Sequence, residues 1–198
     1  MKKFLKHIGY GLFIFMLLNI LIVIIYDYSA YKAIKNKTHK NYLKWNDNHT
    51  NINKYDLIIL GSSRTYTAFN PQIIDTSLSI KSYNMGTSAQ DIAESYYSLK
   101  EVLEYQKPKH VVLELYLATA DDVHDYYQIF SNASFFNSSK NKFDLVVDGY
   151  GEKGINNYLI PILKFNNYIK QDLGSVFSKK KEKKKSDKWI RGFLYDTT

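Results

Sequence analysis

Two serines follow a short apolar run at a point where a hydroxyl group could act as a nucleophile. The run from Asp56 to Leu60 (DLIIL) is followed at once by Gly61, Ser62 and Ser63. A short β-branched run bounded by polar residues indicates a buried strand. The carboxyl end of a parallel strand is where α/β proteins bind ligands, and amides there can stabilise a developing negative charge. The same tripeptide also fits a plain turn without a function.

Two further strand ends are expected to lie beside this turn. Strands are predicted over residues 80–85 and 110–116, and helices over 70–75 and 89–105. The alternation of strands and helices predicts parallel pairing with right-handed crossovers. All three strands then end at one edge, which brings Asn84 and Gly86 close to Ser63. We therefore predict an α/β fold with three α/β/α layers and a short, flavodoxin-like parallel sheet.

A serine nucleophile needs a base, and one sequence match could supply it. Asp121 and His124 form an Asp-x-x-His pattern just past the third strand, with His124 as the base and Asp121 as its orienting carboxylate. The competing interpretation is a surface histidine on an acidic helix. The other histidines lie near the N-terminus or at the opposite sheet edge, and none is expected to be the base: His7, His39, His49 and His110.

Composition restricts the partners and cofactors. The 198 residues include 27 Lys+Arg against 19 Asp+Glu and no cysteine. The net charge of +8 favours anionic partners. No nucleic-acid motif is present, so we expect a membrane or an envelope polymer instead. The run Lys179–Lys185 could contact anionic lipid or such a polymer, or could be a solvated loop. No cofactor and no metal ion are expected.

The N-terminal segment is predicted to be a membrane anchor. An apolar run extends from about Ile8 to Tyr26, and Lys2, Lys3 and Lys6 precede it. About twenty apolar residues span a bilayer as a helix, and the lysines should remain cytoplasmic. We therefore predict an uncleaved anchor over residues 1–27, a polar stalk over 28–54 and an extracytoplasmic domain over 55–198. A buried core helix is the alternative.

The second half of the domain gives weaker patterns. Residues 118–130 are expected to form a helix and 131–141 a Ser/Asn-rich loop. Residues 143–148 fit either a strand or a helix. Residues 156–173 are expected to be helical, with an interruption at Pro161. No further strand is expected after the lysine run.

The order of these motifs resembles the SGNH/GDSL hydrolase superfamily, and most of all its membrane-anchored bacterial cell-envelope branch, which includes DltD-like proteins. The likeness covers about residues 55–117. It implies that Ser63 is the nucleophile and that Gly86 donates an oxyanion-hole amide, with Asn84 matching the asparagine before it. Two blocks depart from the family. Tyr116 stands where a glycine and a further oxyanion donor are usual, and no late Asp-x-x-His block is present. The chain is therefore expected to be truncated.

Two functions from different classes follow. The first is a membrane-anchored serine esterase or O-acyltransferase that acts on acyl groups of cell-envelope polymers and is inactive if truncated. The resemblance also implies a membrane acyltransferase as a partner. The second is a non-catalytic, membrane-tethered accessory or binding protein that keeps the α/β scaffold. The first requires a reactive Ser63, whereas the second does not.

Overall fold

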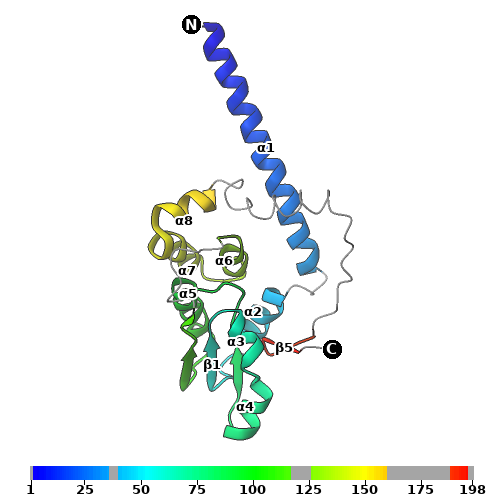
Figure 1. Ribbon diagram of the computed structural model, residues 1–198, viewed down its shortest axis with the longest axis vertical. Coiled ribbons are helices and arrows are strands. Elements are labelled where there is room, and N and C mark those ends of the chain that lie inside the picture. Colours follow the sequence, from blue (N-terminus) through cyan, green and yellow to red (C-terminus); the bar gives the residue numbers. More distant parts are fainter. Residues whose placement is uncertain (1, 36–39, 117–125, 160–187, 196–198) are drawn as a thin grey trace.

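The computed structural model of the chain describes residues 2–35, 40–116, 126–159 and 188–195, and within them an α/β domain follows a long N-terminal helix (Figure 1). The central sheet has three strands, β1 (Leu57–Leu60), β2 (Ser82–Asn84) and β3 (His110–Leu113). Their order is β2-β1-β3, and both outer strands run parallel to β1. The predicted parallel α/β sheet is thus confirmed.

The crossover helices begin at side-chain caps that the sequence contains. Helices α3 (Ser63–Ala68) and α4 (Pro71–Leu78) join β1 to β2, and α5 (Ile92–Leu103) joins β2 to β3. The Asn70 side chain caps α4 by accepting from the Gln72 amide at 2.9 Å, with Pro71 in the first turn. Because β1 lies between β2 and β3, right-handed crossovers place α3 and α4 on one face and α5 on the other.

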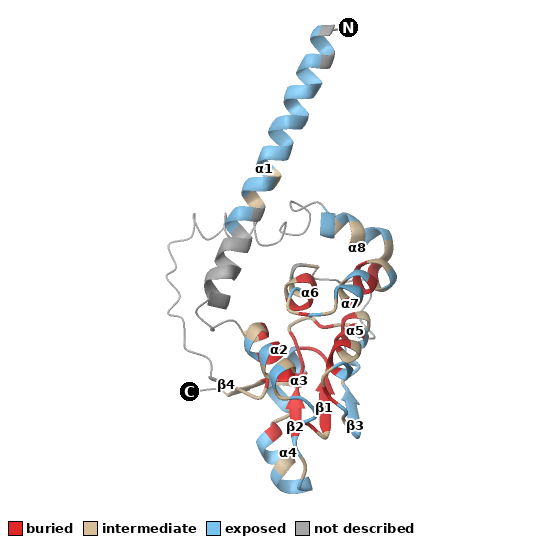
Figure 2. Cartoon of the chain, turned by 180° about the vertical axis from the view of Figure 1, so that it is seen from behind, coloured by how far each residue is buried: buried red, intermediate tan, exposed pale blue. Residues whose placement is uncertain are grey.

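Burial is uneven across the sheet. All four residues of β1 are buried, whereas Val111, Val112 and Leu113 of β3 remain exposed at its edge (Figure 2). Parallel strands are usually covered on both faces, so β3 is atypical. The core extends from β1 and β2 to the helices that follow, and its members include Ile58, Leu60, Tyr83, Met85, Tyr97, Phe136 and Leu145.

Part of the predicted stalk belongs to this core. Helix α2 (Lys40–Thr50) buries Trp45, whose ring lies 4.9 Å from that of Phe136 and whose Nε1 donates to Asn132 Oδ1 at 2.9 Å. Four more helical segments complete the domain: α6 (Tyr126–Ala133), α7 (Ser139–Asp144), η2 (Leu145–Gly149) and α8 (Tyr150–Leu159). The 143–148 segment is therefore helical, and only the middle of the predicted 131–141 loop is non-helical.

A hairpin after the lysine run lies beside β2, so the expectation of no further strand there is wrong. Strands β4 (Lys188–Ile190) and β5 (Phe193–Tyr195) pair antiparallel. The Asn84 amide donates to the Arg191 carbonyl at 3.1 Å, and the Arg191 guanidinium forms an ion pair with Asp75 of α4. The hairpin thus covers the outer edge of β2, while β3 forms the opposite edge of the described sheet.

The predicted transmembrane part of the fold class is wrong. Helix α1 (Lys2–Lys35) extends away from the domain in Figure 1, yet none of the described helices is long and apolar enough to cross a membrane. Its side chains are described without a break only over residues 6–22, and this stretch includes Lys6, His7 and Asn19. A span needs about twenty predominantly apolar residues. The apolar side chains that are described along α1 are exposed, apart from the partly buried Ile22 (Figure 2).

Candidate functional site

The turns after the three strands meet at one edge of the sheet. The Thr87 amide donates to the Gly61 carbonyl at 3.0 Å, and the Glu114 amide donates to the Leu60 carbonyl at 2.9 Å. Gly61 adopts a φ of +145°, and a Cβ there would lie 2.6 Å from Cβ of Glu114. A side chain at residue 61 is therefore excluded both by the backbone conformation and by the close approach of β3. The predicted convergence of strand ends is present.

The two serines of the turn have different surroundings. Ser62 is the N-cap of α3 and is only 2% exposed, and its Oγ accepts from the Arg64 amide at 3.3 Å. Ser63 is the first residue of α3 and is exposed to solvent. The buried hydroxyl is held by the fold, whereas the hydroxyl of Ser63 is accessible to a ligand.

Asn84 is fully buried and joins the second turn to α3. Its Nδ2 donates to the carbonyls of Thr65 at 2.8 Å and Phe69 at 2.9 Å, and its Oδ1 accepts from the Gly86 amide at 3.0 Å. Both groups predicted to face an oxyanion are thus engaged within the protein. The Gly86 amide could serve an oxyanion only after exchanging its bond to Asn84.

Glu114 is the acidic group nearest to the serine turn. Its Oε2 accepts from the Ser62 amide at 3.1 Å and from Ser62 Oγ at 2.6 Å. Desolvation alone would raise the pKa of Glu114, but the bonds from Ser62 and the Tyr116 amide and the charge of Arg64 hold it below its ordinary value. Glu114 is therefore an anion at neutral pH that fixes the turn, and a weak base.

Arg64 stands next to the exposed serine with its guanidinium stacked on an aromatic ring. The guanidinium carbon lies 3.3 Å from the centroid of the Tyr116 ring. Such stacking leaves the edge of the guanidinium, where its N–H donors lie, directed away from the ring. Among the described residues Arg64 makes no ion pair.

The Thr65 side chain fills the space between the two glycine turns. It is fully buried, and a Cβ on Gly86 would lie 2.7 Å from the Cβ of Thr65. Its Oγ1 has no hydrogen-bond partner among the described residues. A buried hydroxyl without a hydrogen-bond partner is unfavourable, so the Thr65 side chain lowers the stability of the folded protein next to the candidate site.

A buried lysine from α2 reaches the second turn. Lys44 Nζ donates to the Gly86 carbonyl at 2.6 Å, to Thr87 Oγ1 at 2.8 Å and to the Met85 carbonyl at 3.3 Å. Desolvation, and to a lesser extent the charge of Lys40, lowers the pKa of Lys44 to about 7, although Glu94 opposes this shift. Burial therefore favours the neutral amine of Lys44 over the ammonium form.

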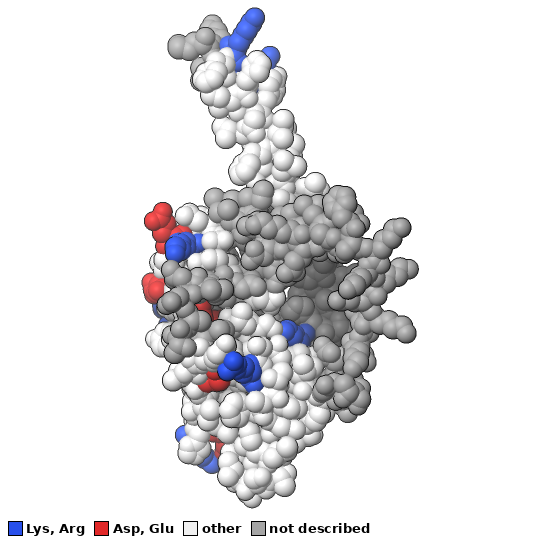
Figure 3. Space-filling model, in the orientation of Figure 1, with Lys and Arg blue, Asp and Glu red and all other residues white. Residues whose placement is uncertain are grey.

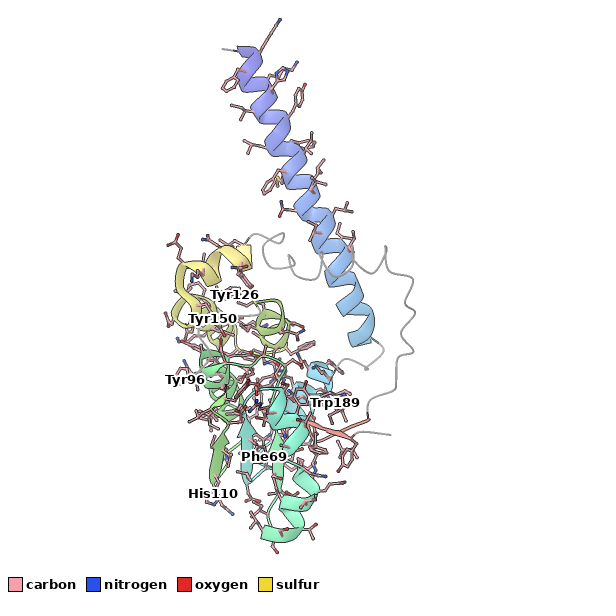
Figure 4. All side chains as sticks on the ribbon, viewed as in Figure 1. Phe69, Tyr96, His110, Tyr126, Tyr150 and Trp189 are labelled. Atoms are coloured by element: carbon pink, nitrogen blue, oxygen red, sulfur yellow. The ribbon has the colours of Figure 1, made fainter. Side chains whose placement is uncertain are left out.

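The predicted base lies outside the described residues. Asp121 and His124 fall in residues 117–125, and His39 falls in 36–39, so their positions relative to Ser63 are not described. His110 opens β3 at the end of the sheet away from the serine turn (Figure 4), as expected. His49 lies on α2, with its Nε2 3.4 Å from Oε1 of the buried Glu101.

The remaining surface features do not extend the serine site. Two clefts, of about 680 and 620 Å³, are lined by residues of α2 and of the segments from 134 to 159, and neither is lined by Ser63. On the face shown in Figure 3, acidic and basic side chains are scattered rather than gathered into one patch. No cluster of metal-binding side chains occurs in the described ranges. The run Lys179–Lys185 lies outside them.

Sequence reasoning missed Glu114 and Lys44. Glu114 could have been recognised in the sequence, because it is a lone carboxylate near the carboxyl end of an apolar strand, where ligand-binding groups gather. No sequence pattern indicates that Lys44 is buried, because its helix has a polar composition typical of an exposed segment. The burial of Asn41, Trp45 and Asn48 beside Lys44 shows in the structure that this face of α2 is buried.

Comparison with known proteins gives no relative. No protein-family model, no curated protein and no solved structure matches the chain.

Proposed function

We propose that the protein is an SGNH-type serine esterase or O-acyltransferase that acts on acyl groups of cell-envelope polymers, with Ser63 as the nucleophile. The observation that carries the proposal is the position of Ser63. It is an exposed serine at the start of α3, directly after the buried strand β1, at the edge where three parallel strands end. This edge is where α/β proteins place their chemistry.

The proposed reaction needs a base and an oxyanion site. Ser63 Oγ would bond to the acyl carbon as a base takes its proton, and the leaving alcohol would then receive that proton. Water or a sugar hydroxyl would release the acyl group in the second step. Asp121 and His124 remain the proposed orienter and base. Negative charge on the acyl oxygen would be stabilised by the Gly86 amide, once this amide has exchanged its bond to Asn84.

Attachment to a membrane is part of the proposal. Exposed apolar side chains run along α1, including those of Phe13, Leu17 and Ile20, and monomeric soluble proteins rarely expose so continuous an apolar surface. Replacing both Leu17 and Ile20 with glutamate should shift the full-length protein from the membrane fraction to the supernatant. If this double variant stays with the membranes, α1 is not the attachment.

One observation favours a second candidate, a non-catalytic accessory protein. Both Asn84 and the Gly86 amide are committed to internal hydrogen bonds, so no amide of this pair faces Ser63 without rearrangement. A binding protein would need no such rearrangement. Its ligand would be an envelope polymer or anionic lipid.

Labelling with a fluorophosphonate probe separates the two candidates. The full-length protein should be labelled, Ser63→Ala should not be, and Ser139→Ala, which removes an exposed serine at the start of α7, should be labelled like the parent. Labelling that persists in Ser63→Ala, or is absent from the parent, contradicts the esterase proposal and favours the accessory protein.

A further inference from the structure

Helix α2 holds the turn after β2 through two lysines spaced one helical turn apart. Lys44 donates to the carbonyls and the hydroxyl of residues 85–87, and Lys40 Nζ donates to Ser88 Oγ at 2.9 Å. Residues at i and i+4 lie on one face of a helix, so both ammonium groups reach the same loop. We call residues 85–88 the glycine loop.

The glycine loop is in turn joined to the helix that carries Ser63. The hydroxyl groups of Tyr66 and Ser88 are 3.1 Å apart, and the Lys40 ammonium lies 5.2 Å from the centroid of the Tyr66 ring. On the other side of the loop, the Thr87 amide is bonded to the Gly61 carbonyl. Contacts therefore run without a gap from α2 through the glycine loop to the serine turn.

The burial of Lys44 is not explained by stability alone. A lysine that is 3% exposed and has a neutral partner at each of its donors must be desolvated on folding, which is unfavourable for the charged form. An apolar side chain of similar length would fill the same volume without this penalty. What the apolar side chain could not do is bind the carbonyl of Gly86.

We propose that Lys44 is a positioning residue, which fixes the peptide groups of residues 85–87 relative to Ser63 and thereby sets the geometry of the oxyanion site. This rests on the proposed function. Lys44 touches no substrate and acts through the Gly86 peptide. Its three hydrogen bonds match the three N–H donors of an ammonium group, and a neutral amine keeps two of these donors. Burial disfavours the charged form, so protonation of Lys44 makes the closed loop less stable relative to an open one.

The charged groups around Lys44 set the direction of the pH effect. Lys40 on the same helix disfavours the ammonium form, whereas Glu94 on α5 favours it. Since the group titrates near neutrality when buried and well above it when exposed to solvent, opening of the loop becomes less favourable as the pH rises above 7. The loop should thus be held more firmly at pH 8.5 than at pH 6.

Amide hydrogen exchange of the full-length protein tests the role of Lys44 without reference to activity. Protection factors of Gly86 and Thr87, corrected for the intrinsic rate at each pH, should rise at least tenfold between pH 6 and pH 8.5. In Lys44→Met they should be lower at the higher pH and show no such rise. Lys107→Met, which changes an exposed lysine, should behave like the parent. Protection that is independent of pH in the parent protein overturns the proposal, and this measurement does not require that the variant folds.

Probe labelling adds a readout that a merely structural role would not move. In the parent, the labelling rate of Ser63 should include a rise centred near pH 7. This rise should be absent in Lys44→Met, and the rate at pH 8 should fall about tenfold. An unchanged pH profile in a folded Lys44→Met overturns the positioning role. Absence of labelling in the parent contradicts the proposed function instead, and the exchange experiment then decides whether Lys44 holds the loop.

Discussion

Ser62 Oγ lies 2.6 Å from Oε2 of Glu114, so a buried hydroxyl at the end of β1 is bonded to a carboxylate at the end of β3. The same carboxylate oxygen accepts from the Ser62 amide at 3.1 Å. The two bonds join neighbouring strand ends at the residue that precedes the exposed Ser63. Hydrogen bonds to a charged acceptor are stronger than those between neutral groups, so this pair is a principal restraint on the serine turn.

Glu114→Gln should loosen the serine turn and lower stability. Glutamine offers one acceptor oxygen and no charge, so it can keep the two bonds from Ser62 only by losing the bond from the Tyr116 amide, and the bonds that remain are weakened. We expect the free energy of unfolding to fall by about 2 kcal/mol, measured by urea denaturation at pH 7. Glu152→Gln, at an exposed position, is the matched control and should change stability little. An equal effect of both substitutions would contradict the role of Glu114.

The bonds to Glu114 also predict a dependence of stability on acid. Because the pKa of Glu114 is held below its ordinary value of 4.5, its contribution is complete above that pH and is lost as the pH falls through the lower, folded-state value. The difference in unfolding free energy between the parent and Glu114→Gln should therefore shrink between pH 5 and pH 3. A difference that stays constant over this range would show that the carboxylate charge is irrelevant.

Asn84→Ala should be strongly destabilising. Asn84 is fully buried, and the substitution leaves the carbonyls of Thr65 and Phe69 and the amide of Gly86 without their partner. Each unsatisfied buried group costs about 1–3 kcal/mol, so a loss of at least 3 kcal/mol is expected. Asn157→Ala removes an amide that bonds only one exposed carbonyl within its own helix and should cost less than 1 kcal/mol. Calorimetric melting of both variants makes the comparison.

The C-terminal hairpin should depend on a glycine at residue 192. Gly192 has a φ of +79°, and a Cβ there would lie 2.8 Å from the carbonyl carbon of Asn84. Gly192→Ala should therefore detach β4 and β5 from β2 and expose residues 188–195 to limited proteolysis. Gly151→Ala is a matched control with a positive φ but open space around its Cα. Residues 188–195 that are as resistant to cleavage in Gly192→Ala as in the parent and in Gly151→Ala would contradict this dependence.

The sequence predicted the sheet and its edge because the relevant signals are local. Apolar β-branched runs locate β1 and β3, and the Asn70-Pro71 pair locates the start of α4. The extent to which each strand and helix is buried was not predicted. The run at residues 110–116 gave the clearest strand pattern, yet β3 is the exposed edge of the sheet. The polar composition of α2 did not indicate that Trp45 and Lys44 are buried.

The sheet edge that carries Ser63 and Gly86 was predicted, but the hydrogen bonds at this edge were not. Motif spacing placed Ser63 and Gly86 on the same edge, but it could not show that the Gly86 amide bonds to Asn84. Motif spacing also did not identify the residues that support the turns after β1 and β2. In the structure, Glu114 after β3 and Lys44 on α2 provide this support. Contacts between segments 40 residues or more apart depend on packing, which a motif does not encode.

The titration of Lys44 should also change the stability of the whole domain above neutral pH. The pKa of Lys44 falls from 10.5 to about 7 on folding, so between these values the unfolded chain binds more protons than the folded one. Stability must then rise with pH across this window. Since each pKa unit corresponds to about 1.4 kcal/mol, the rise has a ceiling of about 5 kcal/mol.

Urea denaturation at pH 6, 7.5 and 9 can measure this rise. The parent should gain stability with each step, whereas Lys44→Met, which cannot titrate, should lack most of the gain. At pH 6 the methionine variant should approach or exceed the parent, because it carries no buried charge. At pH 9 it should be the less stable of the two, because the carbonyl of Gly86 and the hydroxyl of Thr87 have lost a donor that the parent supplies without a charge. Curves that stay parallel across the three pH values would mean that Lys44 titrates in the folded protein as it does in the unfolded chain.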